Sequence, residues 1–280
     1  MPYDFPLGLA TKLSAARIPV RIAPRVFFPE RQLKNESEIA ELRRAMRVTE
    51  LAMARALELL RQCAIAADGK LRLDGADFTS EQLRGEIDAT LALHGASGVG
   101  TIAASGLQSA CPHRRGTGPI VAGTPIVIDI FPRLGDSGYH GDLTRTVVKG
   151  QAPEIVRRAF DAVRTVRDEC KGMIKAGIAG HVPYDHALRR LAEMGFPTGE
   201  TERGCHGFFH GLGHGLGLEV HEPPRLSRNV DYVLAGGEVV TVEPGVYYPE
   251  WGGVRLEDVV VVRADGAECL TEMETFLEID

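Results

Sequence analysis

Residues 207–221 combine three histidines with five glycines, a mixture that is unusual for a protein core. His210 and His214 are four residues apart and could share one helix face. A glycine inside a helix costs about 1 kcal/mol, however, so a helix is not expected here. We predict an extended or bulged segment, in which the glycines let backbone, ligand or metal approach closely while imidazoles project between them. If these histidines bind a metal, its acidic ligands must come from elsewhere in the chain.

Two aspartates flank a predicted hairpin turn. Asp129 belongs to the apolar run 126–130 and Asp142 to the run 139–148. In sequence, the midpoint between them falls between Gly135 and Asp136, where the turn is predicted. Residues equally far from a hairpin turn lie opposite each other, so we expect the two aspartates to face each other across an antiparallel ladder. Like charges in that position destabilise the ladder unless a cation compensates them. The pair alone is also compatible with two solvated side chains.

Two glutamates repeat this pattern further along the chain. Glu243 and Glu257 end or follow apolar runs, and their midpoint is Glu250, in a loop that contains Pro, Trp and Gly. Four carboxylates in apolar surroundings would be costly without a multivalent cation. Together with one imidazole they form an oxygen-rich ligand set that suits Mn(II), Co(II), Fe(II) or Zn(II), and carboxylates can bridge two ions. Such paired ions commonly serve hydrolysis.

The elements that position these residues follow from apolar periodicity and turn signals. Prolines at several positions in residues 1–35 predict an extended arm that could contribute to an oligomer contact. Helices are predicted at 37–62 with Ser37 as the N-cap, and at 80–94, 155–176 and 184–194. Strands are predicted at 126–130, 139–148, 238–243, 246–248, 253–262 and 275–279. This order favours an α+β domain over residues 36–280, with helices on one side of a mainly antiparallel sheet.

Composition narrows the classes of partner. The net charge is −6 and no Lys/Arg cluster is present, which argues against nucleic acid. No signal-peptide pattern and no 18-residue apolar stretch occurs, so we expect a cytoplasmic protein without a membrane partner. The five cysteines are widely spaced and form no Cys-x-x-Cys pair, so we expect mostly buried thiols rather than disulfides or a zinc ribbon.

Several separated motifs resemble, in order, the creatinase/prolidase/aminopeptidase P superfamily of dinuclear metallopeptidases, which has the pita-bread fold. These are Ile-Asp-Ile-Phe-Pro with Gly-Asp-Leu-Thr-Arg-Thr, then His-Gly-Leu-Gly-His-Gly-Leu-Gly-Leu-Glu-Val-His-Glu, Thr-Val-Glu-Pro-Gly and Val-Arg-Leu-Glu-Asp. The resemblance runs from about Asn35 to the last residue. It implies a curved, mainly antiparallel sheet with helices on its outer face, and two divalent ions, with manganese the first choice. The implied metal ligands are Asp129, Asp142, His214, Glu243 and Glu257.

The resemblance also implies roles for residues around the metals. Glu243 would take the proton of the attacking water, and His221 would hydrogen-bond the developing oxyanion. Cys-Pro-His resembles a loop that brings a further histidine, His113, to the substrate. His210 would line the pocket for substrate, and Arg255 would orient a carboxylate ligand. We expect the glycines at 213 and 215 to keep space open for metal and substrate.

The resemblance leaves several functions open. A peptidase that cleaves Xaa-Pro bonds, in dipeptides or at the N-terminus of short peptides, is the preferred interpretation, and a homodimer is expected. Alternatives are a methionine aminopeptidase, a creatinase-like C–N hydrolase, and a non-catalytic peptide-binding or protein-binding module that keeps the fold.

The aspartates lie 13 residues apart, where the family more often has 11, and the family's usual N-terminal domain has no counterpart in this sequence. Asp258 and Glu222 are interpreted as exposed or capping acids.

Overall fold

The computed structural model describes residues 4–19, 28–202 and 204–280, which divide into two compact units at residues 31 and 32. Residues 4–15 of the first unit form helix α1 (Asp4–Ala15), so the expectation of an extended arm is wrong for this part. Pro6 lies in the first turn, where a missing N–H costs no helical hydrogen bond. Within that arm, residues 1–3 and 20–27 lie outside the described residues.

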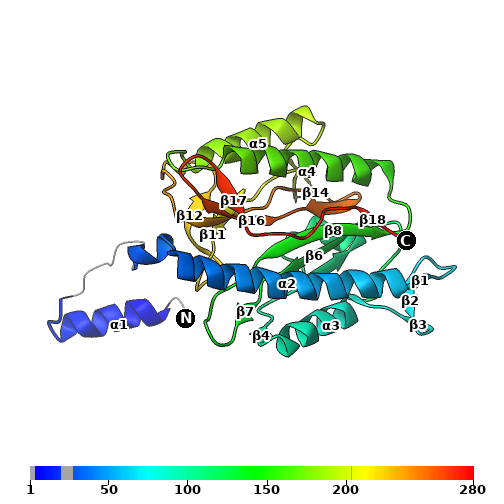
Figure 1. Ribbon diagram of the computed structural model, residues 1–280, viewed down its shortest axis with the longest axis horizontal. Coiled ribbons are helices and arrows are strands. Elements are labelled where there is room, and N and C mark those ends of the chain that lie inside the picture. Colours follow the sequence, from blue (N-terminus) through cyan, green and yellow to red (C-terminus); the bar gives the residue numbers. More distant parts are fainter. Residues whose placement is uncertain (1–3, 20–27, 203) are drawn as a thin grey trace. The chain divides into compact units, whose positions relative to one another are not determined.

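The second unit arranges two helix pairs on opposite sides of the strands (Figure 1). One pair is α2 (Glu36–Gln62) and α3 (Ser80–Leu93), and the other is α4 (Glu154–Met173) and α5 (His181–Glu193). Helix α2 begins two residues earlier than predicted, because Asn35 rather than Ser37 is the N-cap. The Asn35 side chain accepts from the Glu38 N–H, and the Glu38 side chain accepts in return from the Asn35 N–H.

The longer strands form a four-stranded and a five-stranded sheet. The first has the order β18 (Glu278–Ile279), β8 (Leu143–Lys149), β6 (Ile126–Ile130), β5 (Ile102–Ser105). The second has the order β12 (Glu222–Leu226), β11 (Gly213–Gly215), β13 (Val239–Val242), β16 (Asp258–Val262), β17 (Ala267–Cys269). Among the strands that are described, only the β18–β8 pair is parallel. The predicted α+β class with mostly antiparallel strands is therefore confirmed.

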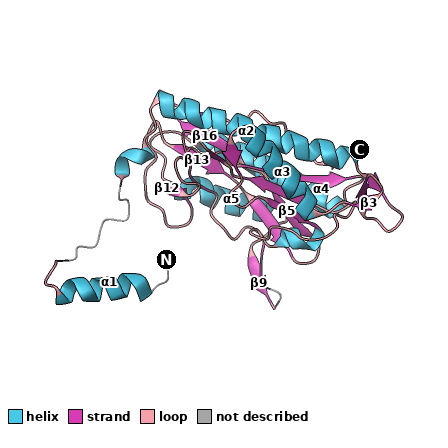
Figure 2. Cartoon of the chain, turned by 90° about the horizontal axis from the view of Figure 1, so that it is seen from below, coloured by secondary structure: helices cyan, strands magenta, loops and turns pink. Residues whose placement is uncertain are grey.

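Short pairs and turns complete the unit. The three-stranded sheet contains β1 (Ala64–Ile65), β2 (Leu71–Leu73) and β3 (Ala76–Asp77). The two-stranded pairs are β4 (Ala96–Ser97) with β7 (Arg133–Leu134), β9 (Gly199–Thr201) with β10 (Gly204–His206), and β14 (Gly245–Tyr248) with β15 (Gly252–Arg255). The β9 hairpin extends away from the body of the unit (Figure 2). Two 3₁₀ turns are η1 (Pro29–Gln32) and η2 (Gly106–Ala110), and none of the helices in the described ranges is long and apolar enough to cross a membrane.

The strand register agrees with the prediction at one acidic pair and differs at the other. Val242 pairs with Asp258 and Gly245 pairs with Arg255, so the ladders on both sides of Glu243 and Glu257 have the predicted register. Asp129 instead pairs with Thr144, two residues beyond the expected partner Asp142. The connection contains strand β7, which pairs with β4 and shifts the turn. Because the slip is an even number of residues, Asp142 stays on the predicted face.

Two apolar clusters explain why helices lie on both sides of the strands. Along β13 and β16, Val239 and Val259 belong to the cluster under α2 and α3, whereas Val240 and Val260 belong to the cluster under α4 and α5. Successive strand residues point to opposite faces, so both faces are apolar and both need a cover. The expectation of helices on one side only is therefore wrong.

Candidate metal centre

The histidine-rich segment contains strand β11, and its glycines let neighbouring backbone approach. A β-bulge lies between His214 and Gly215, as the predicted extended or bulged segment requires. A Cβ atom added at Gly213 would lie 1.9 Å from the carbonyl oxygen of Thr241, and one at Gly215 would lie 2.2 Å from that of Pro223. The space beside these glycines is therefore filled by strand backbone. The expectation that they keep room for metal and substrate is wrong for Gly215, while Gly213 does line the cavity but has its missing side chain directed at backbone.

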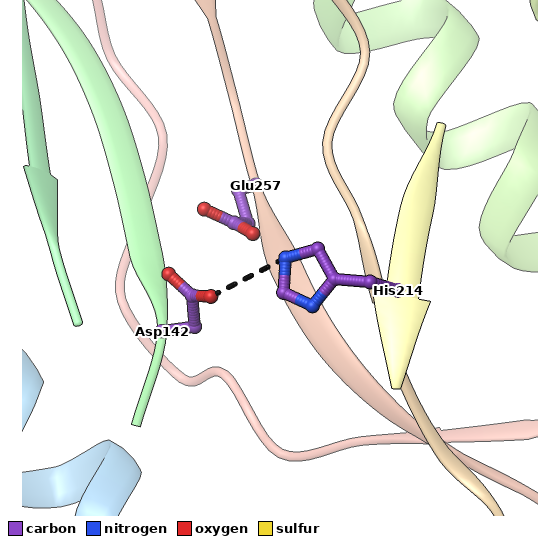
Figure 3. Close-up of side chains that lie close together, drawn as sticks. All are labelled: Asp142, His214 and Glu257. Atoms are coloured by element: carbon purple, nitrogen blue, oxygen red, sulfur yellow. Dashed lines mark ion pairs between the residues drawn. The ribbon is translucent and has the colours of Figure 1, made fainter. Parts of the chain in front are cut away.

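Three residues from different elements converge where a metal ion could bind (Figure 3). Asp142 precedes β8, His214 lies on β11, and Glu257 lies between β15 and β16. One ligand atom of each lies within 4.8 Å of the others, and all three side chains are buried. His214 Nε2 is 3.6 Å from Asp142 Oδ2 and 3.4 Å from Oε1 of Glu243, which adds a fourth residue to the group.

The remaining carboxylate, Asp129, is linked to this group through Arg255. Arg255 Nη2 lies 2.6 Å from Asp129 Oδ2, and its Nε donates to the Thr144 hydroxyl, which in turn donates to Glu257 Oε2 at 2.8 Å. Asp129 Oδ1 and Glu257 Oε1 are buried and have no hydrogen-bond partner among the described residues. Buried carboxylate oxygens without partners are costly, and a divalent cation would satisfy both. The donor set thus fits a metal ion.

The candidate metal centre holds more carboxylates than cationic side chains. Burial raises the pKa of Asp142 and of Glu257 well above their ordinary values, and neighbouring carboxylates add to both shifts. Burial also raises the pKa of Glu243 to about 7, although Arg255 opposes the shift. Burial lowers the pKa of His214 to about 3, so its imidazole is neutral and able to bind a metal. The negative charge must be neutralised by protons or by a cation.

A hydrogen-bonded chain connects the centre to His210. Arg255 Nη1 donates to the Tyr247 hydroxyl at 2.8 Å, and that hydroxyl lies 2.9 Å from His210 Nε2. The Gly211 carbonyl lies 2.7 Å from Nδ1 and can only accept, so the proton of the neutral His210 ring is on Nδ1 and the Tyr247 hydroxyl donates to Nε2. Burial lowers the pKa of His210 to about 3, which agrees with a neutral ring.

Sequence reasoning missed Tyr247 and Thr144. Thr144 has a signal in the period of two along an extended segment, since it is two residues after Asp142, whereas Tyr247 lies on a strand, β14, that begins after Glu243 and has no such signal. A hydroxyl on the same face as a carboxylate is a candidate partner for it.

All predicted site residues line one cavity of about 570 Å³. His113 and His221 are exposed at its wall, and the ring of His221 stands edge-on to that of His214 with centroids 4.3 Å apart. The members of the prediction that the structure brings together here are Asp129, Asp142, His214, Glu243, Glu257, His113, His210, His221 and Arg255.

Two other predictions about polar residues are wrong. Asp258 is buried and pairs with Arg145 at 3.0 Å and Lys171 at 2.6 Å, and Glu222 is buried and pairs with Lys34 at 2.6 Å. Both acids are thus interior ion-pair members rather than exposed or capping groups. All five cysteines are free thiols. The expectation that most of them are buried is wrong, because Cys111, Cys205 and Cys269 are exposed.

Comparison with known proteins places this geometry among metallopeptidases. The model of metallopeptidase family M24 matches residues 40–264. The Xaa-Pro dipeptidase of Pyrococcus horikoshii is 32% identical over 247 residues, which cover 87% of this chain and 64% of that protein. The chain therefore spans less than two thirds of the length of that relative.

Solved structures of a dipeptidase and a prolidase also resemble this chain. The Xaa-Pro dipeptidase from Bacillus anthracis superposes with a TM-score of 0.78 at 30% identity, over 90% of this chain and 65% of that one. The prolidase from Pyrococcus furiosus superposes with a TM-score of 0.75 at 31% identity, over 88% of this chain and 66% of that one.

Proposed function

Because this chain belongs to metallopeptidase family M24, we propose that it is a metal-dependent peptidase that hydrolyses Xaa-Pro bonds in dipeptides or at the N-terminus of short peptides. The observation that carries the proposal is the cavity in which five predicted ligands meet and two buried carboxylate oxygens lack a partner among the described residues. The names of the dipeptidase and prolidase relatives support the Xaa-Pro specificity.

The proposed cofactor is a pair of divalent ions, with manganese the first choice and cobalt, zinc or iron as alternatives. Bound there, divalent ions polarise the scissile carbonyl and activate a water molecule for attack. The oxygen-rich donor set supports manganese, although such sites discriminate weakly between metals. The residues that would hold the ions are Asp129, Asp142, His214, Glu243 and Glu257.

The surrounding side chains supply proton transfer and positioning. Glu243 is the proposed proton acceptor, because its carboxylate lines the cavity beside His214 and is partly open to it. His221 and His113, both at the cavity wall, would donate to the developing oxyanion or to the substrate amide. Arg255 holds Asp129 in place, and His210, fixed by Tyr247, would contact substrate.

The proposal includes the pita-bread fold over residues 36–280, with residues 1–35 as a separate arm. The two helix pairs outside the strand layers support this architecture (Figure 1). A cytoplasmic homodimer belongs to the same proposal, and size-exclusion chromatography with light scattering, together with cell fractionation, tests it.

The proposal is tested by turnover of three substrate sets: Xaa-Pro dipeptides, longer peptides that begin with Xaa-Pro, and Met-Ala peptides, each with added Mn(II) or Co(II). We expect hydrolysis of Xaa-Pro substrates, and loss of activity and of bound metal in Asp142→Ala and His214→Ala. His186→Ala is the matched control, since His186 pairs with Glu169 on helices α4 and α5 and does not line the cavity.

Other outcomes identify the alternatives. Turnover of Met-Ala peptides alone indicates a methionine aminopeptidase, and turnover of a non-peptide C–N substrate such as creatine indicates a creatinase-like enzyme. A protein that cannot be loaded with metal indicates a binding module. Absence of Xaa-Pro turnover with every metal overturns the proposal.

A further inference from the structure

His221 lies at the end of an irregular loop beside the candidate metal centre. Residues 216–221 connect strand β11 to strand β12 and belong to neither strand. Glu222 and Leu226 are buried, whereas the residues that precede each of them, His221 and Arg225, are exposed and line the cavity. Successive residues of an extended segment point to opposite sides. The direction of the His221 side chain therefore follows from the direction of Glu222.

The register of strand β12 is weakly determined by its partner strand. That partner, β11, is Gly-His-Gly, and its pairing with β12 shifts in register between His214 and Gly215. Glycine-rich strands specify register weakly, and a slip of one residue turns every side chain to the other face. Such a slip would direct His221 to the interior and Glu222 to the cavity. The observed pairing of Glu222 with Gly215 thus needs support from another interaction.

Glu222 has this support in a buried ion pair with Lys34. Lys34 Nζ lies 2.6 Å from Glu222 Oε1, and the two side chains are only 2% and 5% exposed. The Lys34 N–H donates to the Gly237 carbonyl at 2.8 Å, and the next residue, Asn35, is the N-cap of α2. The carboxylate therefore faces a cation whose own position is fixed by the backbone around it.

The same carboxylate packs against the beginning of the loop. A Cβ atom added at Gly217 would lie 2.5 Å from Glu222 Oε1 and 2.9 Å from its Cδ. The Gly217 carbonyl also accepts from the His140 N–H at 2.9 Å. Glu222 directly follows the loop and touches its second residue, so the ion pair holds the loop 216–221 at both ends.

Charge makes this arrangement selective. A slip of β12 would separate the ammonium group of Lys34 from the carboxylate of Glu222, and separating a buried ion pair is strongly unfavourable. On the basis of the proposed function, we propose that Lys34 and Glu222 are positioning residues for catalysis. Their ion pair fixes the register of β12 and thereby holds His221 at the cavity.

The test removes both charges together, because removal of one leaves the other buried without this partner and destabilises the fold. In Lys34→Met/Glu222→Gln we expect a folded protein that binds Mn(II) as the wild type does. Its kcat for Leu-Pro should fall by about 10-fold or more, because a misplacement of about 1 Å can cost about 100-fold. Lys149→Met is the matched control, since Lys149 is a buried lysine that donates to the carbonyls of Arg61 and Asp280 and does not line the cavity. Its loss should leave kcat unchanged.

A second background shows whether the ion pair acts through His221. In His221→Ala the paired substitution is expected to lower kcat no further, because the side chain that it misplaces is gone. A loss of general stability would instead lower kcat in both backgrounds. An equal fall in both, an unchanged kcat, or a fall that accompanies loss of Mn(II) overturns the inference while the proposed function stands.

Gly217→Ala tests the same contact without removing a charge. The added methyl group displaces the Glu222 carboxylate from the loop, so kcat should fall in the wild-type background and fall no further in His221→Ala. Gly172→Ala is the control, because Gly172 is exposed on α4 and its added Cβ atom meets no atom within 4 Å beyond its own helix. If Lys34→Met/Glu222→Gln does not fold, this comparison decides the inference, and equal falls in both backgrounds overturn it.

Nuclear magnetic resonance separates the inference from the proposed function. If the wild-type protein hydrolyses no Xaa-Pro substrate, the function fails, and the ring signals of isotope-labelled histidine in protein prepared with Zn(II) decide the inference. The His221 signals are those that disappear in His221→Ala. We expect them to shift in Lys34→Met/Glu222→Gln, because the edge-on contact with the His214 ring changes, and to keep their positions in Lys149→Met. His221 signals that coincide in the wild type and the paired variant overturn the inference.

Discussion

Arg255 and Asp129 form a 2.6 Å ion pair that joins strand β15 to strand β6 at the wall of the cavity. The same guanidinium reaches the Tyr247 hydroxyl and the Thr144 hydroxyl, so it fixes partners on both sides of the site. Arg255 therefore sets the position of one proposed ligand, Asp129, and of the hydroxyls that contact a second ligand, Glu257, and the cavity residue His210.

Replacement of Arg255 should weaken metal binding more than it perturbs the fold. We expect Arg255→Met to lower the affinity for Mn(II) by about 10- to 100-fold, because Asp129 loses the donor that orients it. Isothermal titration calorimetry measures the change. Arg164→Met, at an exposed arginine paired with Asp161, is the control and should bind Mn(II) as the wild type does. Unchanged affinity in Arg255→Met would show that Asp129 needs no such support.

The stabilisation provided by metal should grow with pH. In the metal-free protein the pKa of Glu243 is raised from 4.5 to about 7, so its proton contributes stability that is full below pH 4.5 and is lost as the pH rises through 7. A metal ion must displace that proton, so it binds better once the proton has gone. We expect the increase in Tm caused by Mn(II) to rise between pH 5 and pH 8, and to rise less steeply in Glu243→Gln. An increase that is the same at every pH would contradict this linkage.

Gly213 should be important for stability rather than for access to the metal. Its added methyl group would meet the Thr241 carbonyl oxygen in a strand that cannot move without breaking its ladder. Overpacking typically costs about 1–3 kcal/mol, so Gly213→Ala should lower the free energy of unfolding by at least that amount. In Gly211→Ala, where the nearest atom lies at 3.4 Å, the loss should be small. Urea denaturation of the two metal-free variants compares them directly.

Asp258 should be among the most sensitive acidic positions for folding. It is buried between Arg145 and Lys171, so Asp258→Ala leaves the interior cation Arg145 without its carboxylate partner. Loss of one member of a buried pair costs about 3–5 kcal/mol. Asp161→Ala, which removes an exposed i,i+3 pair, should cost about 0.5 kcal/mol or less. Equal midpoints of chemical denaturation for the two variants would refute the interior role of Asp258.

Local signals in the sequence were sufficient to predict strand register where two paired strands are joined by one short loop. The pairing around Glu243 and Glu257 follows from one short loop, and the predicted register agrees with the observed one on both sides. At Asp129 and Asp142 the connection also carries β7, whose partner Ala96 lies in another part of the chain. The midpoint between the two aspartates in the sequence takes no account of such a distant pairing partner. The predicted register of Asp129 and Asp142 was therefore wrong by two residues.

Interior charges could not be predicted for a related reason. Glu222 is buried because Lys34 lies against it, and Asp258 because Arg145 does, yet these partners are far apart in sequence. The positions of Gly213 and Gly215 likewise depend on the backbone of Thr241 and Pro223. Only packing in three dimensions shows that these glycines serve strand contact.

The apolar cluster under α2 also has a consequence for biosynthesis. It combines Leu42 and Met46 on that helix with Val259, Leu270 and Ile279, which a ribosome adds more than two hundred residues later. This part of the cover of α2 is therefore completed long after the helix has left the ribosome, whereas α3 follows it directly. During translation this helix is the surface on which chaperones would act and from which aggregation would begin.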